Sequence, residues 1–145
     1  MAFSGNFLCT SFKVELMKGV HNFTSSGGNT FNVALYNNSA SFNAATTAYT
    51  SSNEISGTNY TAKGQALNPV TPVASSTTAL VDFADEVFSN VTISSVRGAL
   101  IFNDSASGDP SVCVLDFGAD KAASSGDFTI VFPTADASNA IIRIA

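Results

Sequence analysis

Three short apolar runs near the C-terminal half constrain the fold of this chain more than any other feature. They are Val96–Phe102, Val112–Phe117 and Phe128–Phe132, separated by loops of Asn, Asp, Ser, Gly and Pro. Short β-branched or aromatic runs bounded by turn residues are typical of strands. Both alternating sets of positions are largely apolar, as in Val114 and Leu115. Strands of this kind are covered on both faces, by a second layer or by a partner.

The rest of the chain predicts further strands around one short helix. The helix is expected at Ser11–Lys18, capped by Thr10 or Ser11 and ended by Gly19. The other expected strands are Phe31–Leu35, Gln65–Val73, Ala79–Phe83, Val87–Ser94 and Ala140–Ile144. Two prolines, Pro69 and Pro72, favour an edge strand or a bulge for the second of these. Seven to eight short strands with polar turns predict a mainly β, single-domain antiparallel β-sandwich with one short N-terminal helix.

One domain spanning residues 1–145 fits the length, with two segments set apart from its strands. Residues 1–9 form an N-terminal arm, and residues 37–64 form a long polar loop excursion. A long segment without periodicity is usually functional or packs on itself, and we expect this one to pack along a neighbour. In both segments, aromatic or other apolar side chains stand among small polar residues, a mixture that is typical of binding loops. The candidate interface residues are Phe3, Phe7, Leu8, Phe42, Tyr49 and Tyr60.

Two alternatives to an interface stay open at this point. Phe3 and Phe7 can instead fold back and cover their own sheet. Tyrosines in polar loops, such as Tyr49 and Tyr60, are also common without any partner, because isolated apolar residues on a surface need no explanation.

Charge and hydropathy exclude several classes of partner. The chain has a net charge of −5 with only six Lys and Arg, which do not cluster, so nucleic acid is not an expected partner. No apolar run approaches the roughly 18–20 residues that cross a membrane. The patch at Phe7–Cys9 is too short for the core of a signal peptide, so no secretion signal is expected.

No motif predicts catalysis or a cofactor. The single histidine, His21, follows the expected helix and is interpreted as a capping or loop residue, because no nucleophile motif accompanies it. Cys113 is interpreted as a small core residue, and a disulfide with Cys9 is a minor alternative. Asp116-Phe117-Gly118 matches the kinase tripeptide without any other kinase motif. Catalytic and cofactor-binding residues are therefore predicted to be none.

Metal binding has one weak candidate. Asn103, Asp104 and Asp109 share one loop and carry the oxygen atoms that calcium prefers. The loop lacks the spaced acidic pattern and the distal Glu of an EF-hand, and such residues usually serve local turn hydrogen bonds. We therefore predict no metal site and leave calcium at Asn103–Asp109 as the minor alternative.

Four blocks of the sequence resemble a family of small structural proteins of tailed bacteriophages. They are SFKVELMKGVHNF, TTAYTSSNEISGTNYTAKGQAL, TTALVDFADEVFSNVTISSVRGALIFND and VCVLDFGADKAASSGDFTIVFPTADASNAIIRIA. The resemblance implies a non-enzymatic virion component, in first place a capsid decoration (cement) protein on the outer capsid surface. Its implied partners are the major capsid protein, or another virion protein, and copies of itself in a homo-oligomer such as a trimer.

Two other functions remain open at this stage. A tail, neck or fibre-associated protein of the same particle would share the composition and the fold. A carbohydrate-binding module is the further alternative, since β-sandwiches with tyrosines in polar loops can stack on sugars.

Overall fold

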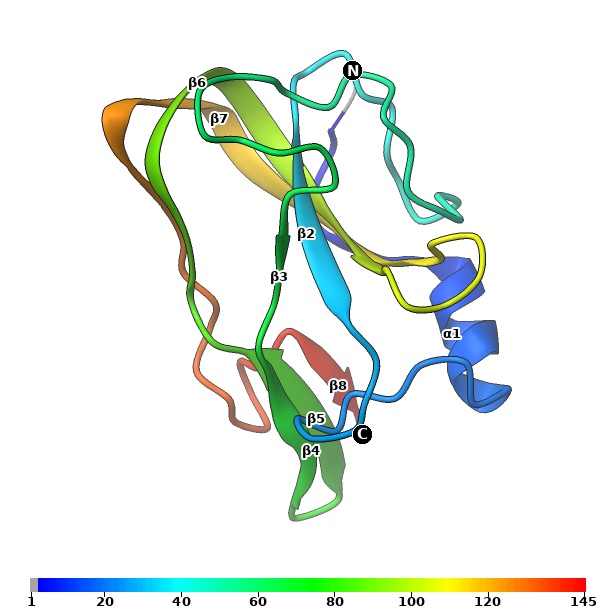
Figure 1. Cartoon of the computed structure of the whole chain (residues 1–145). Coiled ribbons are helices and arrows are strands. Elements are labelled where there is room, and N and C mark those ends of the chain that lie inside the picture. The colour runs from blue at the N-terminus through cyan, green and yellow to red at the C-terminus, as the bar shows by residue number, and fades with distance from the viewer. Residues whose placement is uncertain (1–2) are drawn as a thin grey trace.

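The computed structural model describes residues 3–145 as two antiparallel sheets and one short helix, which confirms the mainly β, sandwich-like fold (Figure 1). The larger sheet has the order β1-β7-β6-β2-β3, and the smaller has the order β4-β5-β8. The larger sheet comprises β1 (Phe7–Leu8), β7 (Ser111–Ile130), β6 (Glu86–Asn103), β2 (Phe31–Tyr36) and β3 (Gln65–Ala66). The smaller sheet comprises β4 (Pro69–Ser75), β5 (Thr78–Phe83) and β8 (Ile142–Ile144).

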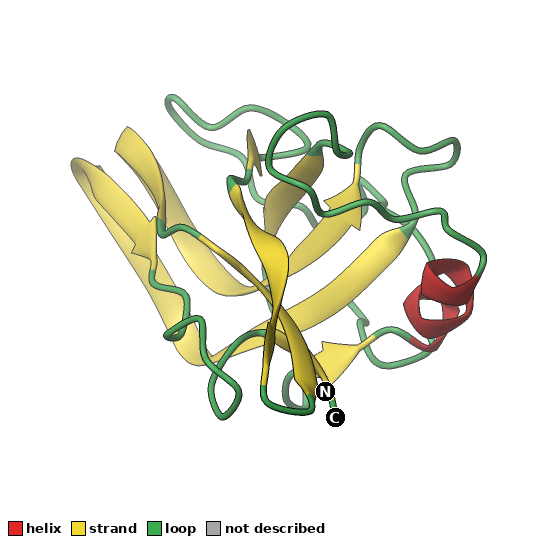
Figure 2. Ribbon diagram, turned by 90° about the horizontal axis from the view of Figure 1, so that it is seen from below, coloured by secondary structure: helices red, strands yellow, loops and turns green. Residues whose placement is uncertain are grey.

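One long hairpin, β6–β7, dominates the larger sheet and corrects the expectation of short strands only. The expected runs Val87–Ser94 and Val96–Phe102 belong to a single strand of 18 residues. Val112–Phe117 and the start of Phe128–Phe132 belong to a single strand of 20 residues, which ends at Ile130. The hairpin curves away from the molecule at one end, and the helix lies at the opposite end (Figure 2).

Bulges explain how polar residues stay inside these long strands. The β6–β7 register shifts at five places. Residues with positive φ lie close to four of the shifts: Asn90, Ser95, Gly118 and Ser125. Each extra residue turns the strand so that the next apolar side chain faces inward again. Phe88, Val91, Ile93 and Val96 are buried as a result, at alternating spacings of three and two residues.

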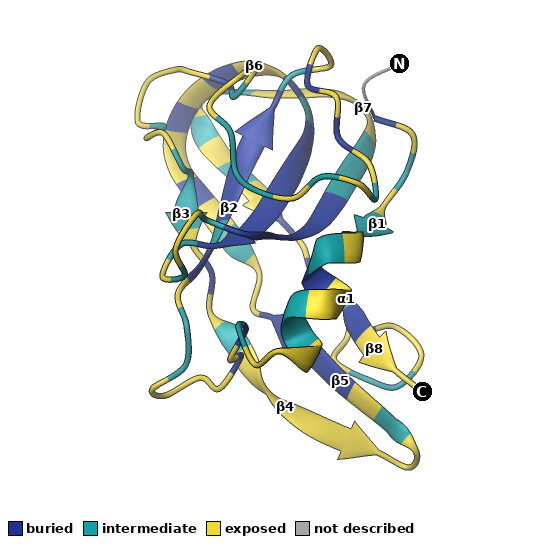
Figure 3. Cartoon of the chain, turned by 90° about the vertical axis from the view of Figure 1, so that its right-hand side faces the viewer, coloured by how far each residue is buried: buried dark blue, intermediate teal, exposed yellow. Residues whose placement is uncertain are grey.

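The two-sided apolarity of the central strands is satisfied within the chain itself. One face of the larger sheet presents Phe31, whose ring stacks on the ring of Phe23 with the centroids 4.2 Å apart. The centroid of the Phe31 ring also lies 6.2 Å from that of Phe83 in the smaller sheet. The other face presents Tyr36 and Phe102, which pack against Phe42 and Tyr49 of the excursion at 4.6 and 4.8 Å. The central part of the larger sheet is thus the middle layer of three, and β2 is dark blue along most of its length in Figure 3.

The helix α1 (Thr10–Met17) begins one residue before its expected start and ends one residue before its expected end. Its N-cap is Cys9, and neither Thr10 nor Ser11 makes a capping side-chain hydrogen bond, which corrects that expectation. Tertiary contacts hold this end instead, since the Thr10 N–H donates to the Ala44 carbonyl at 2.8 Å. Gly19 follows the helix with φ of 72°, as predicted.

The arm and the excursion both pack on the main sheet. Within the arm, Met1 and Ala2 lie outside the described residues, while Phe7 and Leu8 pair with Val114 and Cys113 as β1. The excursion forms no strand of its own, but three isolated bridges tie its neighbourhood to the sheet and the hairpin loop. The sheet of the same chain therefore covers the buried side chains of the excursion. Packing of the excursion along a neighbour stays a prediction.

Candidate functional site

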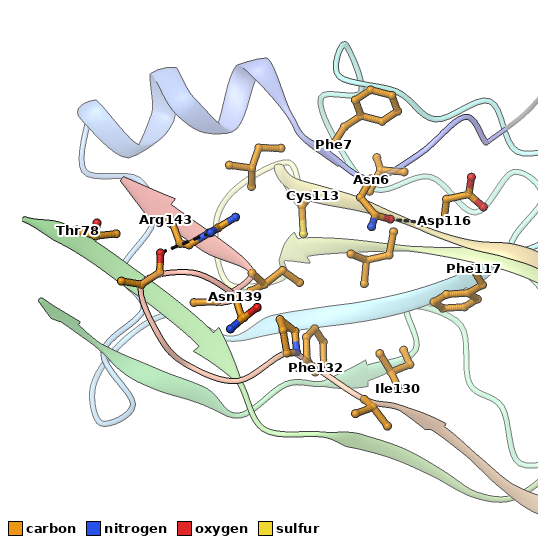
Figure 4. A pocket seen from close by; sticks show the side chains of 18 of the residues that line it. Asn6, Phe7, Thr78, Cys113, Asp116, Phe117, Ile130, Phe132, Asn139 and Arg143 are labelled. Atoms are coloured by element: carbon orange, nitrogen blue, oxygen red, sulfur yellow. Dashed lines mark hydrogen bonds between the residues drawn. The ribbon is translucent and has the colours of Figure 1, made fainter. Parts of the chain in front are cut away.

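A groove of about 690 Å³ lies between the two sheets (Figure 4). One wall consists of β1, the start of β7 and Asn6, and the other consists of the segment from Ile130 to Ala145. Most of the lining side chains are apolar, including Phe7, Leu115 and Phe132. A hollow of this size, lined mainly by apolar side chains with several polar groups among them, is typical of a binding site.

The groove lies beside strand edges with no paired neighbour. The short strand β1 pairs with only Cys113 and Val114 of β7. Among the described residues no strand pairs with β7 beyond that point on the side away from β6, and β8 pairs with β5 alone. Unpaired edges carry free N–H and C=O groups that can bind another extended chain. Val131, next to the groove, has 74% of its surface exposed.

The charged groups near the groove are engaged with other parts of the chain. Asp116 accepts a hydrogen bond from Arg97 Nε at 3.3 Å, and its own N–H donates to Asn6 Oδ1 at 2.7 Å. Arg143 donates through Nη1 to the carbonyls of Ala137 and Ser138. The groove therefore has a mainly apolar lining beside one ion-paired carboxylate and one guanidinium that is hydrogen-bonded to backbone carbonyls.

Cys113 lines the groove but is poorly suited to chemistry. Burial raises the pKa of its thiol strongly, so the reactive thiolate is disfavoured. Both cysteines are buried and free, so the disulfide that the sequence left open is not formed.

The candidate interface residues separate into three groups. Phe3 and Phe42 are buried, and their rings pack edge to face with the centroids 6.0 Å apart. The expectation that these two side chains are free for a partner is therefore corrected. A Cβ at residue 98 would overlap the Phe3 ring. The glycine at this position therefore leaves the space that the ring occupies. Phe7 and Leu8 lie in the groove, half-buried.

The third group is the tyrosine pair, which a partly buried acid, Glu54, holds in place. Tyr49 and Tyr60 donate their hydroxyl protons to the carboxylate of Glu54 at 2.6 and 2.8 Å. The N–H of Lys63 donates to the same carboxylate at 2.8 Å. Burial and the bond to Glu54 raise the pKa of Tyr49 to about 12. Both rings also pack on the sheet, Tyr49 against Phe102 and Tyr60 against Phe88.

His21 lies in the loop after α1, within the capping-or-loop prediction, and its side chain is buried. Its Nε2 lies 2.9 Å from Glu15 Oε2, and its Nδ1 lies 3.2 Å from the Asn103 amide nitrogen. Because that amide donates, Nδ1 accepts and Nε2 carries the proton that is donated to Glu15. The ring therefore ties α1 to the end of β6.

The acidic turn considered for calcium already holds a cation from the chain. Lys63 Nζ lies 2.8 Å from Asp104 Oδ1 and 2.8 Å from Asp109 Oδ2. Asn103, the third suggested ligand, is buried and accepts hydrogen bonds from Ser105. Across residues 3–145, no group of three or more His, Cys, Asp and Glu side chains is placed to hold a metal ion.

Reasoning from the sequence did not identify Glu54, Lys63, Asp82 or the C-terminal wall of the groove. Isolated charged residues in a polar loop carry no local signal, and a single acid such as Asp82 inside an apolar run is the one visible irregularity. In the structure the carboxylate of Asp82 is buried.

Comparisons of the chain with models of known protein families, with curated proteins and with solved structures find no match. No helix in residues 3–145 combines the length and the apolar character that crossing a membrane requires.

Proposed function

We propose that the chain is a non-enzymatic structural protein of a bacteriophage particle, a capsid decoration (cement) protein that binds the outer capsid surface and bridges capsomers. The proposal starts from the resemblance of four sequence blocks to small phage structural proteins. An acidic surface without basic clusters also suits a protein that stays outside the packaged DNA.

The single observation that carries the proposal is the apolar groove beside the unpaired edges of β7 and β8. Main-chain groups on such an edge give affinity to an added strand, and neighbouring apolar pockets select its side chains. Asp116 is ion-paired with Arg97, and Arg143 is hydrogen-bonded to backbone carbonyls, so both charged side chains near the groove already have partners in the chain. The proposed occupant is an extended segment of the major capsid protein.

The test of the function is the copy number in purified particles, measured against the capsid protein. A decoration protein is expected in numbers comparable to the lattice positions. A few copies per particle, located at the tail or neck, would contradict decoration and favour the tail alternative. Repeated sites on a lattice also favour a homo-oligomer, since joined copies gain avidity.

The test of the site uses two exposed valines. Val131→Asp places a charge beside the groove, and Val73→Asp places the same charge on β4, where Val73 is 51% exposed. We expect V131D to lose occupancy on stripped particles and V73D to keep it. Equal occupancy of both variants and the wild type would remove the groove as the contact surface.

The carbohydrate-binding alternative depended on Tyr49 and Tyr60. Both rings pack on phenylalanines of the sheet and both hydroxyl groups are bound to Glu54, so neither ring is a free platform for a sugar. A glycan array would still test it directly, and no binding is expected.

A further inference from the structure

A carboxylate lies buried in the middle of the smaller sheet. Asp82 of β5 is 1% exposed. Its Oδ1 accepts the N–H of Phe83 at 2.9 Å, while its Oδ2 receives no hydrogen bond of normal geometry from any described residue. An ionised oxygen that is buried without a donor costs free energy, so it needs an explanation.

The cover over this carboxylate is the C-terminal segment, residues 133–145. Side chains alternate along β5, so Leu80 and Asp82 lie on the face opposite to Phe83, which packs into the main core. Arg143 of β8 lies opposite Leu80 and donates to the carbonyls of Ala137 and Ser138. The start of the segment is tied down by Asp85, whose carboxylate accepts the N–H of Phe132 at 2.8 Å.

The charges around Asp82 are mostly of its own sign. Burial first, and then the carboxylates of Asp136 and Asp85, raise its pKa, while the N–H groups of Phe83 and Ile141 oppose the rise. Asp136 stays ionised, because the Asn139 amide and the Ser138 N–H hold its pKa below the usual value. The strand β4 carries no titratable side chain.

Two further charged groups lie near this site on other elements. Arg143, the one cation on β8, is bound to loop carbonyls, and its charge lowers the pKa of Asp136. Glu86, at the start of β6, has a pKa raised by burial. Neither group supplies a hydrogen bond to Asp82 Oδ2.

We propose that Asp82 is a proton-operated latch, whose protonation closes residues 133–145 onto the smaller sheet and whose ionisation loosens them. The protonated acid removes the repulsion from Asp136 and Asp85. Because the same segment forms one wall of the groove, the latch controls how firmly that wall is held. This inference does not depend on what the groove binds.

The direction of the pH effect follows from the linkage between proton binding by Asp82 and closing of residues 133–145. The closed state holds the proton more tightly than the open state, so closing is penalised above the pKa of the closed state. The penalty decreases as the pH falls through that pKa, and it disappears below the ordinary aspartate value of about 3.9.

Hydrogen exchange of the whole chain tests the latch. Protection of the amides in 133–145, corrected for intrinsic exchange, is measured at about pH 4.5 and about pH 7.5, the range above the ordinary aspartate value. We expect several-fold greater protection at the lower pH in this segment and no comparable change in residues 99–103 of β6. Equal protection of 133–145 at the two pH values would overturn the proposal.

Two variants assign the effect to this residue. Asp82→Asn cannot ionise, so it should give high protection at both pH values. Asp120→Asn removes the same charge from a position whose side chain is 52% exposed and should behave like the wild type. A D82N protein that keeps the wild-type pH dependence would show that another group operates, and the proposal would fail.

Discussion

Two regions of the molecule bury their strands to different degrees. In the larger sheet, β2 and β6 place Val33–Tyr36 and Ala99–Phe102 fully inside, between the excursion on one face and the smaller sheet on the other. In the smaller sheet, β4 is exposed along most of its length, and one face of β5 is covered by a single segment (Figure 3). Stability should therefore be concentrated in the larger sheet, and motion in the smaller one.

The two regions also differ in how the chain hydrogen-bonds an acid, the partly buried Glu54 in one and the buried Asp82 in the other. Glu54 accepts three hydrogen bonds and fastens the excursion onto the larger sheet. Asp82 accepts one hydrogen bond of ordinary length, from the Phe83 N–H, and faces two like charges beneath the C-terminal segment. A satisfied carboxylate strengthens its cover, whereas an unsatisfied one weakens it. The contrast implies that equivalent charge removals should have opposite effects in the two regions.

The largest effect is expected from Phe102→Ala. Phe102 is fully buried in β6 and contacts Tyr49, so truncation leaves a cavity between the middle layer and the excursion. We expect a loss of about 3–5 kcal/mol in the free energy of unfolding, measured by urea denaturation. Val73→Ala, at an exposed position in β4, is the matched control and should change stability by less than about 0.5 kcal/mol. Similar losses for both would contradict the contrast in burial.

A smaller and local effect is expected from Leu80→Ala. Leu80 is 2% exposed, yet it belongs to the face of β5 that only residues 133–145 cover. We expect a cost of about 2 kcal/mol, seen as lost hydrogen-exchange protection in β5 and β8 while β6 keeps its protection. The exposed neighbour Ile144→Ala should have little effect. Loss of protection across both sheets would mean that the two regions unfold as one unit.

Much of this fold was predictable because its signals are local. Alternation of apolar residues located β2 and β5, and Gly19 located the end of the helix. The continuity of β6 and β7 was not predictable, since Asn90, Ser95 and Ser125 are residues that usually mark turns. Only pairing with the opposite strand shows that they form bulges inside long strands.

The candidate site was harder to predict, because contacts distant in sequence create it. Phe3 is buried by its fit to Gly98, and no local pattern distinguishes it from the half-exposed Phe7. The groove takes its walls from both ends of the chain and from β7. The apolar surplus of the central strands was interpreted as a possible partner surface, but Phe42, Tyr49 and the smaller sheet of the same chain cover it.

The smallest effect, and the sharpest contrast, is expected from Glu54→Gln. The amide keeps one acceptor oxygen but turns a donor toward a tyrosine hydroxyl or the Lys63 N–H, so at least one hydrogen bond to a charged group is lost. We expect a loss of about 1–2 kcal/mol, measured by urea denaturation near neutral pH. Asp82→Asn, the same chemical change in the smaller sheet, should leave stability unchanged or increase it.

The two acid-to-amide variants together decide whether the hydrogen bonds to each acid set how firmly the segment above it is held. If E54Q weakens the excursion, hydrogen exchange should increase in residues 37–64 and stay unchanged in 133–145. In D82N the change should be confined to 133–145 and have the opposite sign. A loss of stability in both variants would mean that a negative charge is required in each region. The difference between the two regions would then lie in packing alone, and Phe102→Ala and Leu80→Ala would measure all of it.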